Sequence, residues 1–229
     1  MLRITFDGPD MVGKTTLINS LARVLEEAWH RVVIFREPYD WFPYYQWGNK
    51  DVEKMQHNIR GRVFEKSDEF VLYAKYRNVL YNELSNRLSD SVVVLQDRSV
   101  VSTLIYNVAK EDRSFCLDYC ADLFGDLCVL IGPKSIFQRS SSEVDEIDND
   151  VEKQMAVAEA LSEVSFALAQ ANGTRFLFCA TPEDAYTGVL TYLLGRRNHA
   201  PAAYSPNFGP PPPNTSAREV LPELYAAGR

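Results

Sequence analysis

The segment from Gly8 to Thr15 constrains the fold of this chain more than any other. It reads Gly-Pro-Asp-Met-Val-Gly-Lys-Thr and fits the pattern G-x-x-x-x-G-K-[ST]. An apolar run over 2–6 precedes it, and apolar residues at helical spacing between 17 and 28 follow it. Glycines let backbone N–H groups surround a phosphate, and the start of a helix adds positive potential. The sequence therefore predicts a strand, a phosphate-binding loop and a helix in succession.

Within this loop, the residue types suit different parts of a bound triphosphate. Lys14 is expected to bridge the β- and γ-phosphates, and the Thr15 hydroxyl is expected to bind Mg²⁺. The candidate triphosphate-binding residues are Gly8, Val12, Gly13, Lys14, Thr15 and Thr16.

A second motif follows the apolar run at 92–95, where the chain reads Gln-Asp-Arg. Asp97 would end a strand close to the phosphate loop, because ligands of open parallel sheets gather at the carboxyl ends of the strands. A carboxylate there can hold Mg²⁺ through water. The planar guanidinium of Arg98 can neutralise a phosphoryl group. The alternative is a surface salt bridge at the end of a strand.

Short apolar runs alternate with helical patterns along the chain. This arrangement is typical of a parallel sheet covered by helices. We predict a three-layer α/β domain with a five-stranded parallel sheet and helices on both faces. The expected strands cover 2–6, 31–35, 92–95, 127–131 and 175–179, and further helices are expected over 69–88, 151–171 and 182–194.

Composition limits the classes of function. The 229 residues suit one domain, and the formal charge of −7 argues against binding to nucleic acid. No apolar run is long enough to span a membrane, and the first residues lack a signal-peptide pattern, so a cytoplasmic location is expected. The four cysteines form no CxxC pair, which favours buried free thiols over a zinc site.

The composition changes after residue 197. The stretch 198–229 holds seven of the 12 prolines, including a run of four that no helix or central strand can accommodate. We therefore predict a domain over 1–197 and a Pro-rich C-terminal tail over 198–229. The tail can be a disordered terminus, a segment that docks to a partner, or an arm packed on the same fold.

Four motifs in this order resemble the thymidylate kinases, a family of P-loop nucleoside monophosphate kinases, from Met1 to about Arg196. Asp10 is the aspartate at the third position of the loop, and Arg36-Glu37-Pro38 follows the second strand. A helix motif L-[FY]-x-x-x-R is present at 72–77, and the Asp-Arg motif continues into a helix with serine and tyrosine at set spacings over 97–106.

The resemblance implies roles for these residues. Asp10 would contact the deoxyribose 3′-hydroxyl and the magnesium shell, and Arg36 and Arg98 would hold the monophosphate of the acceptor. Tyr73 would stack on the base and Arg77 would donate to its edge; they lie four residues apart and so share a helix face. The full set of substrate-binding candidates is Asp10, Arg36, Pro38, Tyr73, Arg77, Arg98, Thr103 and Tyr106.

Two segments depart from the family pattern. The expected lid over ATP, 140–150, contains five acidic residues and no basic one. The basic side chain that stabilises the charge on the transferred phosphoryl group would therefore be Arg139, or else Lys153. Residues 39–47 contain six aromatic side chains, which can wall a base pocket, form an interface or serve the fold alone.

The resemblance implies ATP- and Mg²⁺-dependent phosphorylation of a pyrimidine deoxynucleoside monophosphate, dTMP to dTDP in the first place, by a homodimer. Asp10, Lys14, Arg98 and Arg139 would be the catalytic residues, and Thr15 and Asp97 the metal ligands. Three alternatives stay open. One is a deoxynucleoside kinase with Glu37 as general base, and another is a kinase for a 5-modified pyrimidine such as 5-hydroxymethyl-dUMP. The third is a non-catalytic nucleotide-binding protein.

Overall fold

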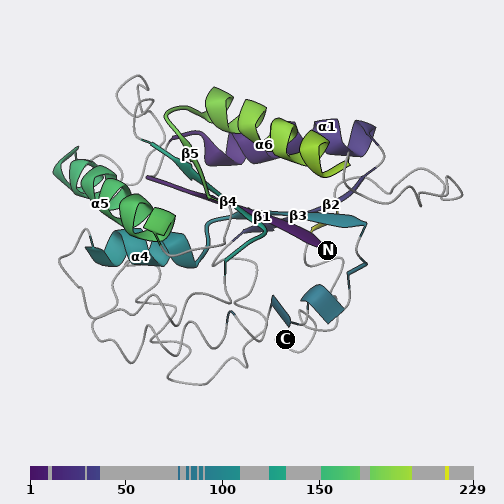
Figure 1. The fold of residues 1–229 in the computed structure, drawn as a ribbon, viewed down its shortest axis with the longest axis horizontal. Coiled ribbons are helices and arrows are strands. Elements are labelled where there is room, and N and C mark those ends of the chain that lie inside the picture. The colour runs from purple at the N-terminus through teal and green to yellow at the C-terminus, as the bar shows by residue number, and fades with distance from the viewer. Residues whose placement is uncertain are drawn as a thin grey trace, which may run out of the picture.

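The computed structural model of this chain describes residues 1–9, 12–28, 30–36, 77, 81–82, 84–86, 88–89, 91–108, 124–132, 151–170, 176–197 and 215–216. Within these residues a parallel sheet lies between two layers of helices (Figure 1). The three-layer α/β architecture predicted from the sequence is thus confirmed.

The strands of the sheet follow the order β5-β4-β1-β3-β2-β6, and every neighbouring pair is parallel. Their bounds are Leu2–Asp7 for β1, Arg31–Arg36 for β2, Val92–Asp97 for β3, Leu127–Ile131 for β4 and Phe176–Cys179 for β5. The five predicted strands are all present. β1 and β3 lie at the centre and run on to Asp7 and Asp97, so two aspartates end neighbouring strands.

Helices cover both faces of the sheet (Figure 1). Helices α1 (Lys14–Glu27) and α6 (Pro182–Arg197) pack together on one face, and α4 (Val100–Val108) and α5 (Val151–Gln170) on the other. Of the helix predicted over 69–88, Arg77, residues 81–82, residues 84–86 and Leu88 are described, and all but Leu88 are helical. No helix in the described part of the chain is both long enough and apolar enough to span a bilayer.

Burial explains why the central strands read as continuous apolar runs. Both faces of a parallel sheet are covered by helices, so side chains pointing either way leave water. In β3, Val92, Val94 and Leu95 are fully buried, and Ile4 and Phe6 of β1 are fully buried beside them. The resulting core holds the carboxyl ends of β1 and β3 rigidly next to each other.

A sixth strand, β6 (Thr215–Ser216), lies within the stretch that the sequence analysis treats as a tail. It pairs with β2 at the edge of the sheet, with Val33 opposite Thr215 and Ile34 opposite Ser216. The expected five-stranded sheet therefore gains one short edge strand. Two residues are too few to show the alternating pattern by which a strand is recognised in a sequence.

Candidate active site

The phosphate loop joins β1 to α1 and is shaped by its two glycines. Gly8 has φ 148° and Gly13 has φ 93°, both in the region that favours glycine. A Cβ added at Gly8 would lie 2.4 Å from the carbonyl oxygen of Ile131, so the close approach of β4 also requires glycine there. Gly13 is the N-cap of α1 and has no side chain to cap the helix. The first N–H groups of the helix can therefore donate to an anion.

Lys14 is buried, and its ammonium group lies within the loop. Its Nζ donates to the carbonyl oxygens of Gly8, at 3.1 Å, and Pro9, at 2.6 Å. The positive charge is thus held next to the N-terminus of α1, where two sources of positive potential add. Of the other loop candidates, Thr16 is exposed, whereas the side chain of Val12 is packed in the hydrophobic core.

The side chains of Thr15 and Asp97 are in contact at the carboxyl end of β3, although 82 positions separate them in the sequence. The Thr15 hydroxyl donates to Asp97 Oδ2 over 2.8 Å. A hydroxyl and a carboxylate are oxygen ligands of the kind that Mg²⁺ prefers, so this pair fits the expected metal. Elsewhere in the described residues, no three His, Cys, Asp or Glu side chains gather into a metal-binding group.

Arg98 follows Asp97 directly and connects β3 to α4. Its Nη1 donates to the Tyr106 hydroxyl over 3.4 Å, and its guanidinium lies 5.4 Å from the centre of that ring. On the neighbouring strand, Arg36 is exposed and stands opposite Asp97 in the register of the sheet. Two guanidinium-bearing residues therefore end at the same edge as the phosphate loop.

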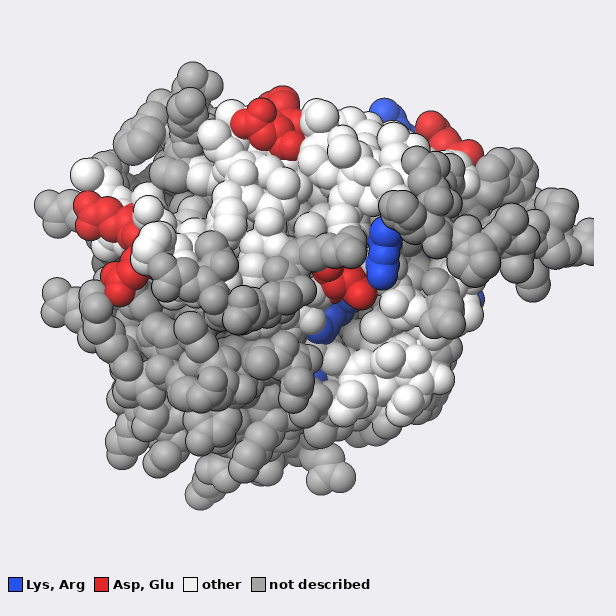
Figure 2. Space-filling view, viewed as in Figure 1, with Lys and Arg blue, Asp and Glu red and all other residues white. Residues whose placement is uncertain are grey.

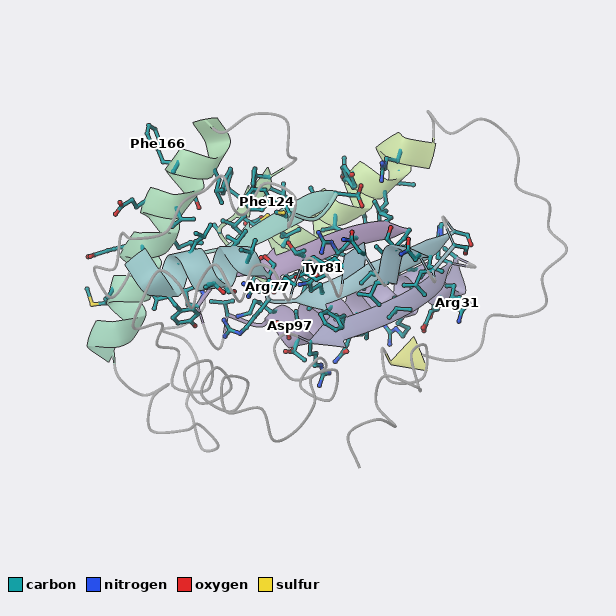
Figure 3. All side chains as sticks on the ribbon, turned by 90° about the horizontal axis from the view of Figure 1, so that it is seen from below. Arg31, Arg77, Tyr81, Asp97, Phe124 and Phe166 are labelled. Atoms are coloured by element: carbon teal, nitrogen blue, oxygen red, sulfur yellow. The ribbon has the colours of Figure 1, made fainter. Side chains whose placement is uncertain are left out.

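Arg77 is almost completely buried, with 2% of its surface exposed. Its Nη2 donates to the Thr103 hydroxyl at 2.8 Å and to the carbonyl oxygen of Ser99 at 3.3 Å. Arg77 is therefore a core residue and not a surface one. Figure 3 shows Arg77 and Asp97 in the middle of the molecule, whereas Arg31, at the start of β2, lies at its edge.

Comparison with known proteins places this arrangement in a family. The family model described as Thymidylate kinase matches residues 6–185, which run from the end of β1 to the start of α6. The chain belongs to the thymidylate kinase family. The resemblance inferred from the four motifs is therefore confirmed.

Individual thymidylate kinases share part of their sequence with this chain. That of Geobacter sulfurreducens is 36% identical over 108 residues, or 45% of this chain and 46% of the relative. That of Lactobacillus delbrueckii is 33% identical over 125 residues, or 52% of this chain and 54% of the relative. The chain spans about half the length of the curated relatives that it matches.

A solved thymidylate kinase from Candida albicans shares the fold. It superposes with a TM-score of 0.58 over 89% of this chain and 96% of that one, at 16% sequence identity. The P-loop kinase fold predicted from the sequence is thus confirmed. The C-terminal stretch that contains β6 lies beyond the residues matched by the thymidylate kinase family model.

Several predicted site residues lie outside the described part of this thymidylate kinase family member. They include the loop aspartate Asp10, the motif residues Glu37, Pro38 and Tyr73, and the lid residue Arg139. The acidic lid over 140–150 and the aromatic segment over 39–47 also lie there, and the side chain of Lys153 is not described. Their roles stay predictions.

The structure also reveals a buried carboxylate that the motifs did not indicate. Asp7, fully buried at the end of β1, accepts four hydrogen bonds of 2.7–2.9 Å. They come from the backbone N–H groups and the hydroxyls of Ser99 and Ser102, at the start of α4. Asp7 precedes Gly8, so it ties the phosphate loop to the helix that carries Thr103 and Tyr106.

Gln96 is a second buried polar residue that the motifs did not indicate. It is fully buried, and its Nε2 donates to the Tyr81 hydroxyl at 2.6 Å and to the carbonyl oxygen of Arg98 at 2.9 Å. The sequence did hold a signal: a glutamine inside an apolar strand must find hydrogen-bond partners. Which partners it finds depends on elements distant in the sequence.

The predicted free thiols are present where they are described. Cys128 and Cys179 are free and buried, whereas Cys116 and Cys120 lie outside the described residues. Burial is the main cause that raises the pKa of Cys128 to about 11, and the nearby charge of Asp7 raises it further. Burial likewise raises the pKa of Cys179 to about 11. Both thiols are therefore protonated at neutral pH.

Charged side chains of both signs lie on one face of the molecule. Figure 2 shows acidic and basic side chains next to each other near the middle of one face. The described residues on this face carry no broad basic patch of the kind that binds the backbone of a nucleic acid.

Proposed function

We propose that this chain transfers the γ-phosphoryl group of ATP to a deoxynucleoside monophosphate, dTMP in the first place, in a Mg²⁺-dependent reaction. The observation that carries the proposal is the contact between Thr15 and Asp97 at 2.8 Å, with Lys14 and Arg98 as their direct neighbours in the sequence. It brings the loop that would bind the triphosphate and the arginine that would bind the acceptor phosphate to one edge of the sheet.

On the donor side, the N–H groups at the start of α1 and the Lys14 ammonium would bind the phosphates of ATP. Thr15 and Asp97 would hold Mg²⁺, Asp97 through water. When bound, the metal supplies positive charge that neutralises the phosphate oxygens. This carboxylate and hydroxyl already touch, so little rearrangement of the protein is needed to form the site.

On the acceptor side, Arg98 and Arg36 would bind the monophosphate. Asp10, Pro38, Tyr73, Arg77, Thr103 and Tyr106 would surround the sugar and the base. Arg77 is the described member of the base-binding pair, and its bond to Thr103 fixes it beside α4. A thymine offers carbonyl oxygens that a guanidinium can recognise, which supports dTMP as the first acceptor.

The chemical step needs little from the protein beyond position and charge. An oxygen of the acceptor phosphate forms a bond to the γ-phosphorus of ATP as the bond between that phosphorus and the bridging oxygen to the β-phosphate breaks. A phosphate monoester is already an adequate nucleophile, so no general base is required. We propose that the basic side chain that covers the transferred phosphoryl group is Arg139, or else Lys153.

A coupled assay of ADP release with ATP and Mg²⁺ tests the proposal. The acceptors are dTMP, dUMP, 5-hydroxymethyl-dUMP, dCMP, dGMP and thymidine. We expect turnover of dTMP and none of thymidine. Turnover of thymidine alone would instead support a nucleoside kinase that uses Glu37. Nucleotide binding without turnover of any acceptor would contradict the proposed activity.

The proposal includes a homodimer, as the family resemblance implies, and a cytoplasmic location, as the lack of a signal-peptide pattern predicts. Sedimentation equilibrium measures the mass of the assembly directly. We expect twice the mass of one chain at micromolar concentration, and a monomer that stays fully active would contradict this part.

A further inference from the structure

Arg98 has an unusual backbone conformation. Its φ is 70°, and among the described residues it is the one non-glycine with a positive φ. A side chain with a Cβ rarely adopts this conformation, because Cβ then approaches the following carbonyl oxygen. Such a residue persists only where its surroundings hold it, and it often belongs to a functional site.

Hydrogen bonds hold the chain on both sides of this residue. The N–H group of Arg98 donates to the carbonyl oxygen of Phe6, at 3.0 Å, and its own carbonyl oxygen accepts from Gln96 Nε2, at 2.9 Å. The next N–H group, that of Ser99, donates to Asp7 at 2.8 Å. The bond from Gln96 thus reaches the backbone of Arg98 itself.

Gln96 is in turn fixed by its own neighbours. The same Nε2 atom donates to the Tyr81 hydroxyl over 2.6 Å, and the Arg3 guanidinium lies 3.7 Å from the centre of the Tyr81 ring. The carbonyl oxygen of Arg98 can only accept, so it fixes which end of the Gln96 amide faces it. Gln96 and Tyr81 are both buried, which strengthens these bonds.

We propose that Gln96 is a positioning residue for the acceptor phosphate. It holds the carbonyl group of Arg98 and thereby the left-handed backbone at that residue. This backbone directs the Arg98 guanidinium toward Tyr106. The Tyr81 hydroxyl, which accepts a hydrogen bond from Gln96, holds Gln96 in place. This inference rests on the proposed function in one respect, namely that Arg98 binds the acceptor monophosphate.

Two variants remove the bond to Arg98 while they keep the volume of the side chain. Gln96→Met removes both donors. Gln96→Glu replaces the amide nitrogen by oxygen but lets the Tyr81 hydroxyl donate in return. In both, we expect the KM for dTMP to rise on the order of tenfold, the effect of one buried hydrogen bond, while the KM for ATP is unchanged. Equal increases in both KM values would overturn the proposal.

Tyr81→Phe is the matched control, because it keeps the bond between Gln96 and Arg98. We expect its KM for dTMP to stay within about threefold of the native value, since only the supporting bond is lost. An increase as large as that of Gln96→Met would overturn the assignment of the effect to the Arg98 contact.

A double-mutant cycle with Arg98→Lys tests whether Gln96 acts through Arg98. If it does, adding Gln96→Met to Arg98→Lys leaves the KM for dTMP unchanged. If the two effects multiply, Gln96 acts by another route and the proposal is overturned.

A second cycle needs no activity and so separates this inference from the proposed function. Arg98→Gly should be more stable to urea than Arg98→Ala, because glycine tolerates a φ of 70°. Adding Gln96→Met should shrink this difference, since the backbone at 98 can then relax. A difference of the same size in both backgrounds would overturn the positioning role, whereas inert acceptors in the assay would overturn only the function.

Discussion

Two aspartates end neighbouring strands of the same sheet, but they differ in burial and in hydrogen-bond partners. Asp7, at the end of β1, is fully buried and accepts four hydrogen bonds from Ser99 and Ser102. Asp97, at the end of β3, is partly exposed and accepts from the Thr15 hydroxyl. The Asp7 carboxylate is hydrogen-bonded within the protein core, whereas the Asp97 carboxylate can exchange the Thr15 hydroxyl for a ligand.

This difference extends to the groups around each aspartate. The buried polar cluster consists of Asp7, Gln96, Ser99, Ser102 and Tyr81, which are all buried and hydrogen-bonded to one another or to Arg98. The phosphate-side cluster consists of Lys14, Thr15, Asp97 and Arg98. We expect substitutions of Asp7 and its serine partners to lower mainly stability and substitutions in the second cluster to lower mainly activity. Gln96, which contacts Arg98, is expected to affect both. The predictions below test that division.

The largest expected effect is on the phosphate-side cluster, at Lys14. Lys14→Met should lower kcat/KM on the order of a thousandfold, because the ammonium charge on the phosphates is lost. The free energy of unfolding should change by only about 1 kcal/mol, as two hydrogen bonds to loop carbonyls are lost but the apolar stem stays. Steady-state kinetics and urea unfolding measure the two quantities.

Arg23→Met is the control for Lys14. Arg23 is an exposed basic residue of the same helix, and its Nε lies 4.0 Å from a carboxylate oxygen of Glu27. Its substitution should leave kcat/KM unchanged. Equal losses in the two variants would mean that the net charge of α1 matters and not the position of Lys14.

The next effect is expected at Asp97. Asp97→Asn keeps an oxygen that can accept from Thr15 but removes the charge that holds Mg²⁺. The rate at saturating substrates should fall on the order of a hundredfold, and the Mg²⁺ concentration for half-maximal rate should rise. Asp126→Asn, at an exposed aspartate before β4, should change neither value. An unaltered Mg²⁺ dependence in Asp97→Asn would remove Asp97 from the metal site.

A smaller effect, on stability and not primarily on activity, is expected at Asp7. Asp7→Asn leaves one acceptor oxygen where two served four donors, so the free energy of unfolding should fall by about 1–3 kcal/mol. Asp97→Asn should lower it by less than about 0.5 kcal/mol, because its partner is exposed. Urea unfolding of both variants checks the order. If Asp97→Asn proved the more destabilising, the division between the clusters would be wrong.

The smallest effect concerns the Cys128 thiol beside the buried polar cluster. Burial raises its pKa to about 11 from the ordinary thiol value of about 9, so above pH 9 the unfolded chain loses this proton first. Native stability should therefore fall as the pH rises from 9 to 11, by roughly 1 kcal/mol at pH 10 from this group. The comparison of the native chain with Cys128→Ala at pH 7 and pH 10 isolates that contribution. A stability difference that does not change with pH would contradict it.

Local pattern was enough to predict much of this protein. The loop from Gly8 to Thr15 is one continuous stretch, and its glycines and lysine have the same roles in any chain that places a strand before it and a helix after it. The apolar runs of β1 to β5 are continuous because both faces of the sheet are covered. For these reasons the sequence predicted the sheet, the family and the position of the phosphate loop.

Contacts between distant residues decided the rest. The sequence suggested no role for Asp7 and gave Gln96 no partners, because their bonds to Ser99, Ser102 and Tyr81 exist only once β1, β3 and α4 are packed together. It did not indicate whether Arg77 is buried, whereas the fold buries it against Thr103. The short strand β6 depends on the free edge of β2 and not on its own two residues. A sequence states which groups can bind, but the energy of a hydrogen bond depends on burial and on the partner, and only the tertiary structure supplies both.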